Sequence, residues 1–139
     1  MMDSFELSLC IMQGHMFELS AQKGMDSEAF VKAFMNSAVA ADLDKNFNHV
    51  QWAGEEYLIS RLSDERPEAL KPGNAFDIET LYWSGYLYRY WHFYTGESSK
   101  AIFKQAPISL MQGVYLMYHA MSIEMAIDRL KESYVERGK

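Results

Sequence analysis

The sequence predicts an all-α protein, a single compact bundle of five to seven helices around a central aromatic-rich helix. Three observations predict this class. Apolar residues recur at steps of three and four along most of the chain, and Asp or Ser precedes several of these segments in the position of an N-cap. No pair of strand-like segments accompanies them. Because 139 residues match the size of one domain, we expect residues 1–139 to form a single helical domain.

The central helix is expected over residues 78–95. Eight of the thirteen residues from Tyr82 to Tyr94 are Tyr, Trp or Phe. Asp77 can cap this helix and Gly96 can end it. The same residues fit a long strand of period two, but no partner strand is visible, so we favour the helix. Aromatic side chains point in almost every direction around it, so other helices should surround it.

The remaining helices are predicted from their caps and from the spacing of their apolar residues. Asp3 and Glu6 have the spacing of a capping box at the first helix, and Ser122 can cap the last. Proline and glycine residues indicate that the longest loop covers residues 64–76. The other expected helices cover residues 3–24, 26–43, 52–63, 98–106, 108–118 and a last segment from residue 122 onward.

A polar seam interrupts the aromatic helix. Gly85, Arg89 and His92 are spaced four and three residues apart, so they fall within about 60° of one another on the helix surface. A buried Arg89 needs a partner, because an unpaired charge inside a protein costs several kcal/mol. We expect Glu55 or Glu56, the nearest acidic residues of the preceding helix, to be its ion-pair partner.

Two interpretations of this seam are open. In the structural one, Arg89 bridges two helices and His92 donates to a backbone carbonyl. In the functional one, Gly85 opens a gap in which Arg89, His92 and tyrosine hydroxyls bind an anionic or planar ligand or a partner. The residues of this candidate binding site are Gly85, Arg89, His92, Tyr82, Tyr86 and Tyr88.

The sequence indicates no catalytic residue, no metal ligand and no cofactor. Its four histidines lie in four different segments, none with a second histidine or a cysteine at metal-ligand spacing. Residues 42–48 resemble the start of a calcium loop, but Phe47 replaces the glycine of its sharp turn and Ala53 its closing glutamate. Cys10 lies among apolar residues, as a core thiol does. We therefore expect a protein that is not an enzyme.

Residues 98–119 offer an alternative function, that of a weak helix-turn-helix regulator that binds DNA. This segment predicts two short helices around Pro107 and contains no acidic residue. The second helix has no Lys or Arg, however, so few phosphate contacts could supply affinity. Nucleic acid is therefore the less favoured partner, and its candidate contacts are Lys100, Lys104, Gln112 and His119.

The net charge of −6 is unevenly distributed along the chain. Residues 1–79 carry six Lys and Arg against fourteen Asp and Glu, which gives −8, and residues 80–139 carry seven against five, which gives +2. An acidic half of this kind favours a basic protein surface as its partner.

No apolar run resembles a membrane span, and the lone Cys10 and the absence of a signal peptide predict a cytoplasmic protein.

Three segments resemble a known family. The run YWSGYLYRYWHFYTGESSKAIF, together with FMNSAVAADLD and QWAGEEYL, is similar to an uncharacterised family of small Firmicutes proteins associated with toxin-antitoxin-like or mobile-element loci. The resemblance covers most of residues 28–106 and carries no catalytic residues. It implies a regulatory or neutralising role. We therefore predict a non-enzymatic antitoxin-like or inhibitor-like module that contacts another protein, such as a toxin or effector, and leave a homodimer as an open alternative.

Overall fold

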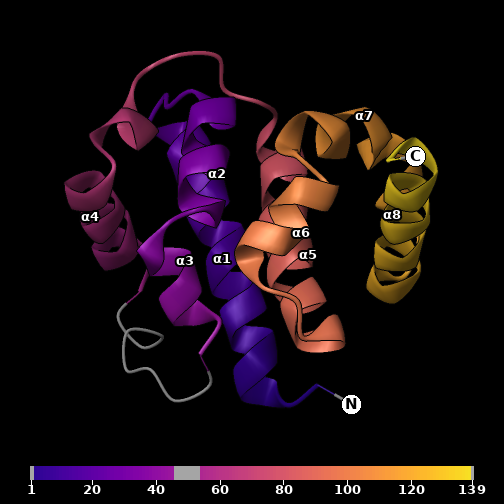
Figure 1. Cartoon of the computed structure of the whole chain (residues 1–139). Coiled ribbons are helices and arrows are strands. Elements are labelled where there is room, and N and C mark those ends of the chain that lie inside the picture. The colour runs from indigo at the N-terminus through magenta and orange to yellow at the C-terminus, as the bar shows by residue number, and fades with distance from the viewer. Residues whose placement is uncertain (1, 46–53, 139) are drawn as a thin grey trace.

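The computed structural model, which describes residues 2–45 and 54–138, confirms the all-α class (Figure 1). The described residues form eight α-helices and one short 3-10 helix, and they contain no strand beyond an isolated bridge between Met25 and Pro72. In chain order the elements are α1 Ser4–Gln22, α2 Ser27–Met35, α3 Ala38–Leu43, α4 Glu55–Glu65, η2 Pro67–Leu70, α5 Ile78–Thr95, α6 Ser99–Gln105, α7 Ile108–Tyr118 and α8 Ile123–Arg137.

Helix α5 lies at the centre of the arrangement and has the predicted bounds, so the alternative strand is wrong. Helix α1 packs along it most extensively, and α6, α7 and α8 also contact it (Figure 1). Gly96 follows α5 in a left-handed conformation with φ of 81°, and its N–H donates to the His92 carbonyl at 2.8 Å. Asp77 occupies the N-cap position, but its side chain makes no capping hydrogen bond.

The segment predicted as one helix over residues 26–43 is two helices, α2 and α3. Ser37 separates them: its hydroxyl donates to the Phe34 carbonyl at 2.7 Å and accepts from the Ala40 N–H at 3.1 Å. These local bonds satisfy backbone groups that a continuous helix would pair internally. The described residues therefore hold eight α-helices where five to seven were expected.

Helix α4 begins later than predicted. Gly54, with φ of 88°, is its N-cap. Trp52 and Ala53, the first two residues of the predicted helix, lie outside the described residues. The predicted loop over residues 64–76 contains the short η2, which begins at Pro67, where the fixed φ of proline suits a first helical turn.

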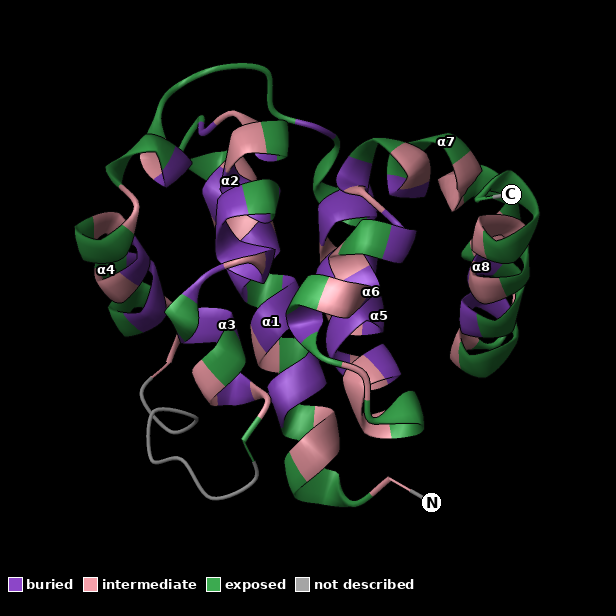
Figure 2. Ribbon diagram, viewed as in Figure 1, coloured by how far each residue is buried: buried purple, intermediate pink, exposed green. Residues whose placement is uncertain are grey.

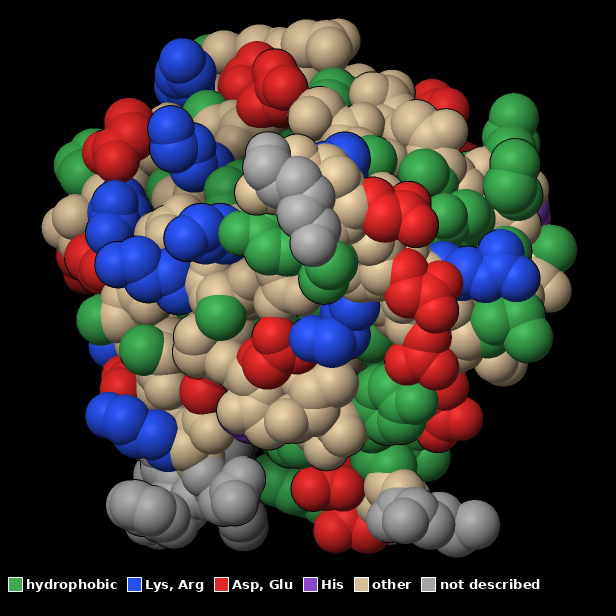
Figure 3. Space-filling view, turned by 45° about the vertical axis from the view of Figure 1, so that its right-hand side comes forward, with side chains coloured by type: hydrophobic (Ala, Val, Ile, Leu, Met, Phe, Trp, Pro, Cys, Tyr) green, Lys and Arg blue, Asp and Glu red, His purple; other side chains and the backbone are tan. Residues whose placement is uncertain are grey.

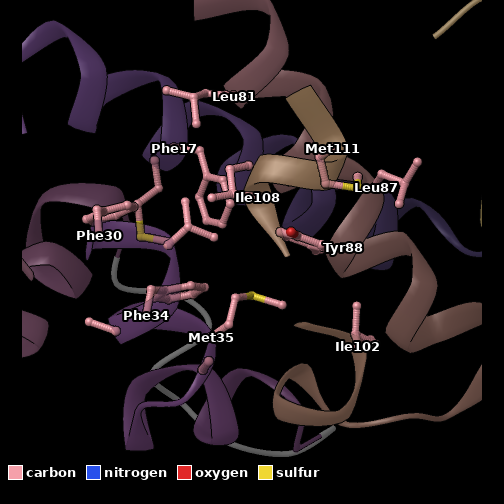
Figure 4. Packing of buried hydrophobic residues seen from close by; sticks show 14 of the residues in the cluster. Phe17, Phe30, Phe34, Met35, Leu81, Leu87, Tyr88, Ile102, Ile108 and Met111 are labelled. Carbon is pink, nitrogen blue, oxygen red and sulfur yellow. The ribbon is translucent and has the colours of Figure 1, made fainter. Parts of the chain in front are cut away.

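The helices enclose one hydrophobic core, and their buried faces point towards it (Figure 2). The Phe17 ring of α1 is edge-on to Phe30 at 5.8 Å, to Phe34 at 5.7 Å and to Tyr88 at 6.0 Å (Figure 4). Each such ring pair contributes about 0.5–1.5 kcal/mol beyond the burial of its area. Aromatic packing therefore joins α1, α2 and α5.

Two glycines let α1 and α5 approach each other closely. A Cβ atom added at Gly85 of α5 would lie 2.7 Å from the Gln13 carbonyl oxygen of α1, and one at Gly14 of α1 would lie 3.0 Å from the Tyr82 carbonyl oxygen of α5. A side chain at either position would push the two backbones apart. The functional interpretation supposed that Gly85 opens a gap for a ligand. It does not, because α1 fills that space.

Candidate functional site

The polar seam of α5 is an internal hydrogen-bond network. The Arg89 side chain is 1% exposed. It donates from Nη1 to Asp44 Oδ1 at 2.6 Å, from Nε to Gln13 Oε1 at 2.9 Å and from Nη2 to Ser99 Oγ at 3.2 Å. Each guanidinium nitrogen thus has a partner. The network connects α5 to α1, to the end of α3 and to the start of α6.

Asp44, and not Glu55 or Glu56, is the ion-pair partner of Arg89, which corrects the prediction. Asp44 is the C-cap of α3, and its carboxylate also accepts from the Ser99 backbone N–H at 2.9 Å and from the Ser99 hydroxyl at 2.8 Å. Glu55 and Glu56 lie in the first turn of α4, where carboxylates interact favourably with the helix dipole. Burial lowers the pKa of the Arg89 guanidinium, and the charge of Asp44 and its hydrogen bond oppose this shift.

His92 belongs to the same network. Its Nδ1 lies 2.7 Å from the Glu97 carbonyl oxygen and 3.7 Å from Asp44 Oδ1. Because a carbonyl oxygen only accepts, Nδ1 carries a proton, as the structural interpretation of the seam predicted. This bond holds the turn between α5 and α6 against the last turn of α5.

Tyr88, another of the candidate residues, lies in the core (Figure 4). Its hydroxyl donates to the Ala106 carbonyl at 2.5 Å, and burial raises its pKa well above the ordinary value. Gly85, Arg89 and Tyr88 are buried, and the His92 side chain is only 12% exposed. The seam therefore presents no open surface, and its geometry supports the structural interpretation.

Tyr82 and Tyr86 lie on another face of α5, where they border an open groove of about 620 Å³. A hollow of this volume suits a small ligand or a side chain of a partner. Its walls come from α1, α5, the end of α7 and the start of α8. We call it the aromatic groove, and it is lined by Glu18, Ile78, Glu79, Tyr82, Trp83, Tyr86, Tyr115, His119 and Ile123.

The rings of the aromatic groove stand at different angles. Trp83 is edge-on to Tyr115, with centroids 5.5 Å apart and planes at 76°. Tyr115 stacks on His119 at 4.4 Å with planes at 12°, and the Tyr82 and Tyr86 rings lie 6.3 Å apart. Aromatic surface therefore borders the hollow from both α5 and α7.

The charged side chains of the aromatic groove are negative. Glu18 and Glu79 line it, and no Lys or Arg does so in the described part of the chain. Burial raises the pKa of Tyr82, and the negative charge of Glu18 raises it further because it opposes ionisation of the hydroxyl. Burial also raises the pKa of Tyr86. Both hydroxyls are thus neutral at neutral pH, and the carboxylates set the charge of the groove.

A second hollow, of about 540 Å³, adjoins the aromatic groove, because Glu79 and Tyr115 line both. It also contains a further carboxylate and, within residues 2–45 and 54–138, no Lys or Arg. We call the two hollows together the acidic aromatic surface. The remaining residues of the second hollow are Asp77, Thr80, Gln112 and Leu116.

The candidate nucleic-acid contacts do not share one hollow. Lys100 and Lys104 are exposed on α6, where they line a separate hollow. Gln112 lines the second hollow together with Asp77 and Glu79, and His119 lines the aromatic groove together with Glu18 and the same Glu79. Carboxylates repel phosphates, so this arrangement does not favour the helix-turn-helix alternative.

A second polar cluster, centred on Glu97, connects α8 to α5 and α6. The Glu97 carboxylate accepts from Trp91 Nε1 at 2.8 Å, from Lys131 Nζ at 2.7 Å and from Gln105 Nε2 at 2.6 Å. Burial opposes ionisation of this carboxyl, but the hydrogen bonds outweigh burial and lower its pKa to about 2. The cluster holds α8, which carries one wall of the aromatic groove, against the core.

Replacing Glu97 with glutamine should remove a pH-dependent part of the stability. Because the pKa of Glu97 falls from 4.5 to about 2 on folding, its contribution is complete above pH 4.5 and is lost as the pH falls towards 2. Allowing for screening by solvent, we expect a loss of about 1 kcal/mol at pH 7. Urea unfolding of both proteins from pH 7 to 2 measures this difference. A difference that does not shrink with acid would contradict the assignment.

Comparisons with protein-family models, with curated proteins and with solved structures gave no match. The resemblance to a family associated with toxin-antitoxin-like loci therefore stays a prediction.

None of the described helices is long and apolar enough to cross a membrane. The described residues also contain no cluster of three His, Cys, Asp or Glu side chains that could hold a metal ion, and His49 lies outside them.

The aromatic groove was not predicted from the sequence, although the spacing of its α5 residues indicates that they share one face of the helix. Glu79, Tyr82, Trp83 and Tyr86 follow one another at steps of three, one and three, which places them on one face of α5. Their partners on α7 are far away in the sequence, and nothing local in the chain indicates which face of α5 they meet. The prediction therefore concentrated on the charged seam of α5.

Proposed function

We propose that this is a non-enzymatic protein that binds another protein through the acidic aromatic surface. The observation that carries the proposal is the composition of this surface: two adjoining hollows bordered by aromatic rings and by Glu18, Asp77 and Glu79, with no Lys or Arg lining either within the described residues. Surfaces of complementary charge steer partners together and exclude wrong ones. The partner that fits is a segment with apolar residues and basic residues beside them.

Exposed apolar side chains next to the hollows support this proposal. Leu116, which lines the second hollow, is 84% exposed, and its neighbour Met117 is 69% exposed. They are the most exposed large hydrophobic side chains in the described part of the chain. No Asp, Glu, Lys or Arg occurs between Lys104 and Glu124, so α7 is uncharged along its whole length. Apolar surface rimmed by polar residues is typical of protein interaction sites.

The charge of the acidic aromatic surface favours a basic partner. In the view that turns the α7 and α8 side forward, most Lys and Arg lie on the left-hand half, whereas acidic side chains lie on both halves (Figure 3). A second copy of this chain is a poorer occupant, because a two-fold dimer would bring the same carboxylates together. A toxin or effector with a basic face would fit, and its neutralisation in the cytoplasm is the role that the sequence predicted.

A photo-reactive amino acid placed at Leu116 tests this proposal. In host cells it should cross-link to one partner, whereas the same group at Val135 of α8, which is also exposed but lines neither hollow, should not. Binding of the purified partner should then weaken by about tenfold or more on Leu116→Asp or Glu79→Lys. Unchanged binding by both variants would show that the partner, if any, uses another surface.

A further inference from the structure

We infer that the aromatic groove is a subsite for a cationic side chain, a lysine or arginine of the partner protein. This inference rests on the proposed function and assigns a chemistry to one of the two hollows. The carrying observation is the combination of two carboxylates, Glu18 and Glu79, with four Trp and Tyr rings around one open volume of about 620 Å³. Either feature alone would be unspecific, and together they match the requirements of an organic cation.

The rings provide the first requirement, an electron-rich surface. A cation binds over the face of Trp or Tyr within about 6 Å of the ring centre, because the ring quadrupole is negative there. Trp83 and Tyr115 stand at 76° to each other in edge-to-face contact, and both line the same volume. Tyr86 borders the same volume from the next turn of α5. An alkyl stem with a charged end can therefore contact several rings at once.

The carboxylates provide the second requirement, a compensating charge. Glu18 enters from α1 and Glu79 from the first turn of α5, so the cation would have an acidic group on each of two helices. Glu18 also contacts His15 Nδ1 at 3.1 Å, which orients its carboxylate from the side of α1. No Lys or Arg among the described residues lines the groove; the basic side chains at it are the imidazoles of His119, in its lining, and His15, against Glu18. A ligand ion pair at this partly covered site would be stronger than one on an open surface.

Lysine and arginine side-chain analogues test the inference directly. The probes are n-butylammonium and n-butylguanidinium, with 1-pentanol as an uncharged molecule of similar size, and the readout is the indole N–H resonance of Trp83 in the full chain. We expect at least one cation to shift this resonance saturably and to bind roughly threefold or more tightly than 1-pentanol. High salt should weaken the cation and leave 1-pentanol unchanged.

Matched variants locate the binding. Glu18→Gln with Glu79→Gln, and separately Tyr86→Leu, should each weaken the cation by roughly threefold or more. Tyr94→Leu is the control, because Tyr94 is an exposed tyrosine of the same helix that lines neither hollow. Backbone amide spectra of all variants show whether the fold is kept. Equal weakening by Tyr94→Leu would overturn the assignment of the site.

Two other results would overturn the inference. Equal binding of 1-pentanol and the cations would make the groove a plain apolar hollow, and the absence of any saturable shift would mean that it is no subsite. Neither result touches the proposed function, which is tested at Leu116. Conversely, the groove could bind the cations while no partner binds through Leu116. That result would support the groove as a cation site and would contradict the proposed function.

Discussion

Replacing Asp44 with alanine is expected to lower the free energy of unfolding by about 3–5 kcal/mol. The Arg89 side chain, 1% exposed, would keep its charge in the core and lose its anionic partner at 2.6 Å. Ser99 would lose the acceptor of two hydrogen bonds at the same time. A loss of this size is a large part of the 5–15 kcal/mol that stabilise a typical domain.

Asp42→Ala is the matched control for this variant. Asp42 lies in the same helix, pairs with Arg61 at 3.1 Å and is 23% exposed, so its loss should cost about 1 kcal/mol or less. Urea unfolding measures both. If Asp44→Ala is too unstable to purify, Asp44→Asn retains an oxygen acceptor for Arg89 and should give an intermediate loss. Similar losses for the Asp42 and Asp44 variants would contradict the buried ion pair.

Gly85→Ala is expected to destabilise the protein by about 1–3 kcal/mol, although alanine is the better helix former. The added methyl group would lie 2.7 Å from the Gln13 carbonyl oxygen and 2.9 Å from Phe17 Cγ. Backbone cannot rotate away as a flexible side chain can, so α1 and α5 would have to separate. The separation would also lengthen the hydrogen bond from Gln13 Nε2 to the Gly85 carbonyl, now 3.0 Å.

Gly113→Ala is the control for this substitution. Gly113 lies within α7, and a Cβ atom there would meet nothing within 4 Å. The same chemical change should therefore stabilise the protein by about 0.5–1 kcal/mol. Thermal unfolding of the two variants should shift in opposite directions. A stabilising Gly85→Ala would mean that α1 and α5 do not approach as closely as the packing of Gly85 indicates.

Local signals were sufficient for most of the fold. Asp3 and Glu6 form the capping box that their spacing predicted, and Ser122 caps α8 as expected. Helix α5 was predicted to the residue because Gly96 has the conformation that ends a helix. The break at Ser37 was missed because the apolar spacing of α2 continues into α3 and masks the cap between them.

The partner of Arg89 could not be predicted from the sequence. The prediction took Glu55 and Glu56 from the preceding helix, but the pairing depends on where the end of α3 meets the start of α6, and Asp44 and Ser99 are 55 residues apart. Only tertiary packing brings these segments together. The same holds for the aromatic groove, whose walls come from α1, α5, α7 and α8.

Helix α5 thus carries two different sets of residues. Gly85 and Arg89 face α1 and the buried network, and Glu79, Tyr82 and Tyr86 face the open groove. Variants of the first set should change stability, and variants of the acidic aromatic surface should change binding. The aromatic content of this helix therefore serves both the core and, in our proposal, the recognition of a partner.

The most direct test of this division is the dissociation constant of the purified partner, measured by calorimetry at a temperature where all variants are folded. Asp44→Asn should leave the constant within about twofold of the unmodified protein, since it alters only the buried network. Glu79→Lys should raise the constant by about tenfold or more, because it reverses a charge shared by both hollows. Loss of binding in Asp44→Asn with unchanged binding in Glu79→Lys would contradict the account.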